Sequence, residues 1–115
     1  MKYLMTYAQK SKTPPTPENM AAIGKFTQEM AASGVLLMTG GLQRPTKGTQ
    51  LKLADGKFTA TDGPFAETKE LIDGFALVEV KSKEEAFAVA ERFMKIAGDG
   101  EGEILQVFDP GGPPG

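Results

Sequence analysis

The residues best suited to chemistry lie in one short run, residues 62–70. It combines a carboxylate, a stiff corner, an aromatic side chain and further charges: Asp62, Gly63, Pro64, Phe65, Glu67 and Lys69. Glycine and proline in sequence exclude a continuing helix, so this run makes a rigid loop. Because binding groups concentrate on loops held by rigid scaffolds, the run is the first candidate for a functional site.

Asp62 has three possible roles on the sequence alone. As a turn residue, it accepts hydrogen bonds from backbone N–H groups one to three residues ahead. As a general acid/base of a lyase or isomerase, it needs a raised pKa, with Lys69 or Arg44 stabilising a developing anion. As a binding group, it needs only a pocket with a few directed polar groups.

Composition restricts the function classes. The 115 residues suit one domain, and 40% hydrophobic with 24% charged residues is ordinary for a soluble globular protein. A net charge of -2 gives no reason to expect nucleic acid or an anionic membrane as partner. Without cysteine, disulfides, thiolate zinc sites and cysteine nucleophiles are excluded. No signal segment or membrane span is evident, so we expect a cytoplasmic protein without metal or cofactor.

The first half predicts a strand, a helix and a second strand. Residues 2–8 alternate with apolar groups on both faces, which is typical of a strand inside a sheet. Thr16 and Pro17 are start signals for a helix over residues 17–33. Its expected buried stripe is Met20, Ile23, Phe26 (or Thr27) and Met30. Residues 35–42 form the next strand, whose Gly40-Gly41 pair marks a bulge or a close backbone approach to something bound.

The second half opens with a hairpin over residues 49–53 and 57–61. Asp55-Gly56 is its turn, and the second strand leads directly into Asp62. The expected cross-strand partners are Leu51 and Leu53 with Phe58 and Ala60.

A strand over residues 75–80, a helix and a last strand over residues 103–108 complete the domain. The helix starts at the capping box Ser82–Glu85 and ends at Ala97. Its expected buried stripe is Phe87, Ala90, Phe93, Met94 and Ala97. Residues 99–103 alternate acid and glycine but lack calcium-ligand spacing, which indicates a flexible connector. We expect one domain over residues 1–108 and a Pro/Gly-rich tail over residues 109–115.

This order of elements predicts an α+β, ferredoxin-like split βαβ fold with an inserted β-hairpin. Both helices then cover one face of the sheet. The strands carry apolar groups on both faces, and burying the second face is favourable at about 25 cal/mol per Å². We therefore expect a homodimer packed sheet to sheet.

Residues 61–70, followed by Gly74-Phe75, resemble the signature of DGPF-domain proteins of the YCII-related family. The resemblance extends over most of the chain, from the opening residues 1–5 to the last helix. It implies a ferredoxin-like α+β fold that dimerises into an α/β barrel with a cleft, in small bacterial proteins of largely unassigned function. Some relatives use a His-Asp pair, and some are encoded beside alternative sigma factors.

This chain contains no histidine, so a mechanism based on a His-Asp pair lacks its base. Binding of a small polar molecule beside the loop is therefore favoured over catalysis. Asp62 is the catalytic candidate, and the binding candidates are Gly63, Pro64, Phe65, Glu67, Lys69 and Arg44. A purely architectural loop in a dimeric protein is the third interpretation.

Overall fold

The computed structural model describes residues 1–10, 16–42, 48–63 and 73–110. The fold is mixed α+β, with two helices and six strands in these ranges. In chain order the elements are β1 (Lys2–Gln9), α1 (Pro17–Ala32), β2 (Leu36–Gly41), β3 (Thr49–Ala54), β4 (Lys57–Asp62), β5 (Gly74–Glu79), α2 (Lys83–Ala97) and β6 (Gly100–Val107). The predicted elements are confirmed, with boundaries that differ by a few residues.

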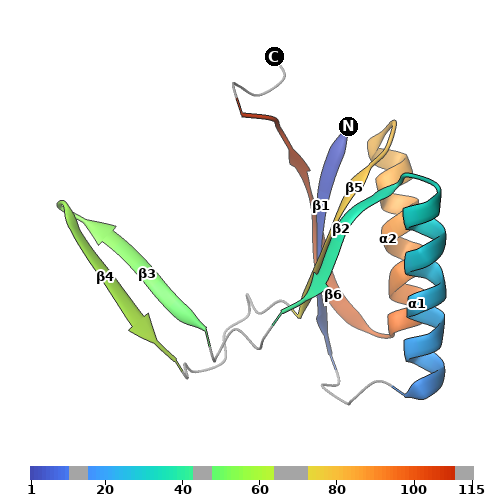
Figure 1. Cartoon of the computed structure of the whole chain (residues 1–115), viewed down its shortest axis with the longest axis horizontal. Helices are drawn as coiled ribbons and strands as arrows, with labels where there is room; N and C mark the ends of the chain where they lie inside the picture. The colour runs from blue at the N-terminus through green and yellow to red at the C-terminus, as the bar shows by residue number, and fades with distance from the viewer. Residues whose placement is uncertain (11–15, 43–47, 64–72, 111–115) are drawn as a thin grey trace.

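Four of the strands form one antiparallel sheet in the order β2-β5-β1-β6. The other two, β3 and β4, pair only with each other as a separate hairpin. Figure 1 shows both helices against one face of the four-stranded sheet and the hairpin standing away on the opposite side. The prediction that β1 lies inside the sheet is confirmed, since β1 pairs with β5 and with β6.

The core lies between this sheet and the helices. Alternate residues of β1 point to opposite faces, and Tyr3 and Met5 point toward the helices. They pack with Val78, Val80 and Ala86, the last of which is fully buried on α2. From α1 the buried side chains are Phe26 and Met30.

The helix starts follow the capping signals. Thr16 Oγ1 accepts a hydrogen bond from the backbone N–H of Asn19 at 3.1 Å, ahead of α1. Ser82 Oγ accepts from the backbone N–H of Glu85 at 3.2 Å, ahead of α2. The Glu85 carboxylate in turn accepts from the backbone N–H of Lys81 at 3.0 Å, one residue before the partner that a capping box predicts.

Two members of the predicted buried stripes are exposed, so those predictions were wrong. Met20 is 61% exposed on α1 and Phe87 is 63% exposed on α2. On α2 the small side chain of Ala86 faces the sheet instead and lets the helix lie close to it. Phe87 follows Ala86 by one residue, and successive residues of an α-helix are about 100° apart around its axis, so Phe87 points away from the sheet.

Residues 99–103 are not a flexible connector, because β6 already begins at Gly100. The acid–glycine alternation has a steric cause in this strand. A β-carbon at Gly100 would collide with the carbonyl oxygen of Ala8, and one at Gly102 with the carbonyl oxygen of Thr6. The glycines therefore allow β6 to approach the backbone of β1.

We expect Gly102→Ala to destabilise the fold by about 1–3 kcal/mol, because overpacking against backbone cannot be relieved by a side-chain rotation. Gly24→Ala is the matched control, since nothing lies within 4 Å of a β-carbon at that position on α1. Alanine there should be neutral or stabilising by up to about 1 kcal/mol. Urea unfolding of both variants measures the difference, and equal stabilities would contradict the steric argument.

Candidate functional site

Asp62 is the last residue of β4 and pairs with Thr49, the first residue of β3. Thr49 Oγ1 donates a hydrogen bond to Asp62 Oδ1 at 2.7 Å, between two exposed residues. Directly beside it, the backbone N–H of Gly63 donates to the carbonyl oxygen of Gly48 at 2.8 Å. The base of the hairpin is thus closed by one side-chain and one backbone hydrogen bond, which orient the carboxylate at the surface.

The remaining predicted site residues, Pro64, Phe65, Glu67, Lys69 and Arg44, lie outside the described residues. Their proximity to Asp62 stays a prediction. Of the residues one to three ahead of Asp62, whose backbone N–H groups a turn cap would bind, only Gly63 belongs to the described residues. The N–H of Gly63, one residue ahead, bonds to Gly48 rather than to the Asp62 carboxylate.

Asp73 ends the segment that leaves Asp62, and it is anchored to the four-stranded sheet. Its backbone N–H donates to the carbonyl oxygen of Tyr7 at 2.7 Å, and its carbonyl oxygen accepts from Leu42 at 2.7 Å. Its carboxylate oxygen Oδ2 accepts from the backbone N–H of Gln9 at 2.7 Å. The two ends of residues 62–73, which we call the motif segment, are therefore fixed by hydrogen bonds, one end at the hairpin base and the other at this anchor.

From the sequence, no role was assigned to Asp73. A short carboxylate commonly accepts hydrogen bonds from backbone N–H groups that are close to it in sequence. Its partner Gln9 is distant in the chain, so only the sheet could bring the two together.

Tyr7 lies beside this anchor and ties β1 to the start of β6. Its hydroxyl donates to the carbonyl oxygen of Gly98 at 2.8 Å, and its ring meets Phe93 edge to face, with ring centres 5.3 Å apart. Burial, together with the negative charges of Asp73 and Asp99, raises the pKa of Tyr7 above its ordinary value of 10.0. Tyr7 is thus a protonated hydrogen-bond donor at neutral pH, with a packing role.

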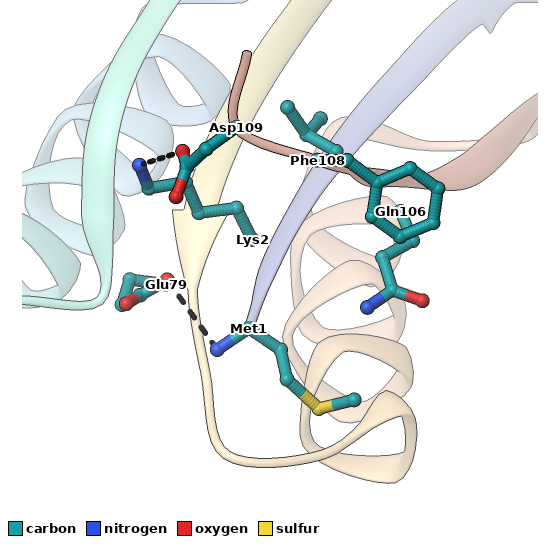
Figure 2. Close-up of a pocket in the computed structure, with 7 residues that line it drawn as sticks. Met1, Lys2, Glu79, Gln106, Phe108 and Asp109 are labelled. Atoms are coloured by element: carbon teal, nitrogen blue, oxygen red, sulfur yellow. Dashed lines mark hydrogen bonds and ion pairs between the residues drawn. The ribbon is translucent and has the colours of Figure 1, made fainter. Parts of the chain in front are cut away.

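A hollow of about 320 Å³ lies at the opposite end of the sheet (Figure 2). Charged groups in it pair with each other: Lys2 Nζ with Asp109 Oδ1 at 3.1 Å, and the Met1 ammonium with Glu79 Oε2 at 3.5 Å. The hydrogen bond that Lys2 donates to Asp109, together with the negative charge of that carboxylate, raises the pKa of Lys2. Both ends of the described chain contribute, so no local sequence pattern could have indicated this hollow. Because its charges compensate one another, we prefer the Asp62 segment as the candidate site.

The sheet face opposite the helices carries an apolar row across all four strands. The strand registers align Met38 with Leu77, Leu77 with Leu4, and Leu4 with Leu105. Met38 is 59% and Leu105 is 48% exposed. We call these four residues the apolar row.

The Gly40-Gly41 pair lies beside the apolar row. A β-carbon at Gly40 would lie 3.2 Å from the ring of Phe75 on β5, so the close approach is made by a neighbouring strand. The register between β2 and β5 also shifts between Leu36 and Met38, which agrees with the predicted irregularity but places it ahead of the glycines.

The described ranges contain neither a cluster of metal-binding side chains nor a helix that could span a membrane. No three aspartate or glutamate side chains there gather closely enough to hold a metal ion, and the chain has no histidine or cysteine. Neither α1 nor α2 has the length and apolar character needed to cross a membrane.

The raised pKa of Tyr7 predicts an alkaline stability loss. The folded state holds the phenol proton more tightly than the unfolded chain, so this contribution is complete below pH 10.0 and is lost as pH rises through the raised pKa. We expect Tyr7→Phe to lower the free energy of unfolding at neutral pH. The difference in free energy of unfolding between wild type and Tyr7→Phe should become smaller above pH 10.0. Urea unfolding over an alkaline pH series checks this, and a constant difference would contradict it.

One comparison with known protein families covers nearly the whole chain. A search of curated proteins finds no match. The family model described as YCII-related domain matches residues 1–109, which include β1, both helices, the hairpin and β6. This chain therefore belongs to the YCII-related domain family.

Proposed function

We propose that this protein is a homodimer, built as a dimeric α/β barrel, that binds a small polar molecule in a cleft beside the Asp62 segment. The observation that carries the proposal is the apolar row, with Met38 and Leu105 exposed, on the sheet face that neither α1 nor α2 covers. The ligand site rests on the placement of Asp62 at the hairpin base, which is one of the two fixed ends of the motif segment.

The strand order supports the finer fold assignment. Helix α1 connects β1 to β2 with β5 lying between them, and α2 connects β5 to β6 with β1 lying between them. Each half is thus a split βαβ unit, the arrangement of ferredoxin-like folds. In such a plan both helices fall on one side, as they do in Figure 1, and the other side is left to a partner.

The exposed apolar side chains support dimerisation. Met38 and Leu105, on the two edge strands of the sheet, are 59% and 48% exposed. Packing the apolar rows of two protomers face to face would bury these side chains, at about 25 cal/mol per Å² of apolar area.

The polar groups of the motif set the ligand chemistry. The carboxylate of Asp62 is exposed and already oriented by Thr49, so it is available to accept hydrogen bonds from a ligand. Glu67, Lys69 and Arg44 are the charged candidates that would complete the site. We further propose that the chain belongs to the DGPF subgroup of its family, and the resemblance of residues 61–70 to the DGPF signature supports this.

The architectural interpretation of the motif is favoured by one observation, the Thr49–Asp62 hydrogen bond. In that case the carboxylate serves the hairpin base and binds nothing else. A lyase- or isomerase-like use of Asp62 as general acid/base needs a bound substrate at the same place. A ligand screen therefore separates the architectural role from the other two, and any ligand found is next assayed for turnover.

The homodimer is tested by light scattering at micromolar protein concentration. We expect twice the mass of the 12.2 kDa chain for wild type and the monomer mass for Met38→Lys, which puts a charge into the apolar row. Met20→Lys is the matched control, because Met20 is 61% exposed on α1 and Met38 is 59% exposed on β2. A monomeric wild type, or a dimeric Met38→Lys variant, would argue against sheet-to-sheet packing.

The ligand site is tested by a thermal-shift screen of small polar metabolites. We expect a compound that stabilises wild type by about 2.7 kcal/mol at a hundred times its dissociation constant and loses this effect in Asp62→Asn. Asp55→Asn is the matched control. It removes the same charge at the other end of the hairpin, where the φ of 52° is one that asparagine tolerates.

Two outcomes would count against the ligand site. A compound that stabilises wild type and Asp62→Asn equally binds elsewhere. If no compound shifts wild type and Asp62→Asn alone melts at a lower temperature, the motif is an architectural corner.

A further inference from the structure

The β3–β4 hairpin has one apolar and one polar face. The register pairs Leu51 with Ala60 and Leu53 with Phe58, and directly paired residues point to the same face. The opposite face carries the alternate residues: Gln50, Lys52, Ala54, Lys57, Thr59 and Thr61. This alternation is what a hairpin shows when one face packs against protein and the other meets water.

No part of the described chain covers the apolar face. Every residue of β3 and β4 is exposed, including Leu53 at 73%, Leu51 at 69% and Phe58 at 56%. An isolated two-stranded hairpin is marginally stable in water, and it needs packing on one face to gain independent stability. The hairpin therefore needs a partner surface to be stable, and Figure 1 shows that it stands away from its own sheet.

A second copy of this chain fits that requirement best. Each protomer presents two apolar surfaces, the partly exposed apolar row on the sheet and the exposed apolar face of the hairpin. In a twofold-symmetric pair both surfaces of each protomer are offered to the other at once. The apolar face of the hairpin adds Leu51, Leu53 and Phe58, each more than half exposed, to the apolar area that such a pair can bury.

We infer that the hairpin is an arm whose apolar face packs against the second protomer, so that Asp62 lies in the intermolecular interface. The position of Asp62 follows from its register. Asp62 pairs with Thr49, and both are two residues from members of the apolar face, Ala60 and Leu51, so they share that face. The candidate site is then incomplete in a single protomer. This inference rests on the proposed homodimer and deepens it.

Thiol labelling tests the arm directly, because the chain has no cysteine of its own. Single variants Leu53→Cys, on the apolar face, and Thr59→Cys, on the polar face, are treated with a maleimide over a series of protein concentrations. We expect Leu53→Cys to react about tenfold or more slowly than Thr59→Cys at high concentration, and this protection to disappear on dilution as the dimer dissociates. Ala60→Cys, on the same face with a small parent side chain, repeats the test if Leu53→Cys weakens the dimer.

The concentration dependence distinguishes the alternatives. Protection that persists on dilution would mean that the hairpin folds onto its own sheet, and it would overturn the inference. Equal labelling of Leu53→Cys and Thr59→Cys while light scattering shows a dimer would overturn the arm but keep the proposed dimer. A monomer at every concentration would overturn both.

The position of Asp62 in the interface is tested by a separate labelling experiment. Asp62→Cys should show the same concentration-dependent protection as Leu53→Cys. Fast labelling at position 62 while Leu53→Cys is protected would remove Asp62 from the interface and return the candidate site to a single protomer.

Discussion

The double pairing of β1 is the constraint on which the rest of the structure depends. This strand hydrogen-bonds to β5 on one edge and to β6 on the other, so its alternate side chains define the two faces of the whole sheet. Tyr3 and Met5 enter the core under the helices. Leu4, between them, necessarily points to the opposite face and becomes the middle of the apolar row.

The same constraint determines how the candidate site is held. The close approach of β6 to β1 requires glycine at Gly100 and Gly102, and it brings Tyr7 to the carbonyl oxygen of Gly98. Beside Tyr7, the backbone of β1 provides the partners that anchor Asp73. The segment leaving Asp62 therefore returns to the most firmly paired strand of the protein, although the hairpin that carries Asp62 stands apart from the sheet.

Much of the fold could be predicted from sequence because its signals are local. The turn at Asp55-Gly56, the caps Thr16 and Ser82 and the alternation in β1 all act over a few residues. Errors arose where a long-range contact decides. Phe87 looks like a core residue on its helix, yet the contact of Ala86 with the sheet turns it outward.

The same distinction between local signals and long-range contacts applies to the candidate site. Sequence indicated Asp62 through the stiff corner that follows it, but it could not indicate Thr49 as its partner, because that pairing depends on the hairpin register. Asp73 was missed as an anchor for a similar reason, since its carboxylate bonds to the backbone of a distant strand.

By itself the sequence determined the elements, their order and the apolar and polar faces of each strand, because hydrophobic period and turn chemistry are properties of neighbouring residues. Only the tertiary structure decided which side of each helix meets the sheet, why positions 100 and 102 need glycine, and which apolar residues line up across strands. Those outcomes depend on strand order and register, in which Leu4 meets Leu77 on one side and Leu105 on the other. Segments so distant along the chain acquire a shared surface only when the sheet forms.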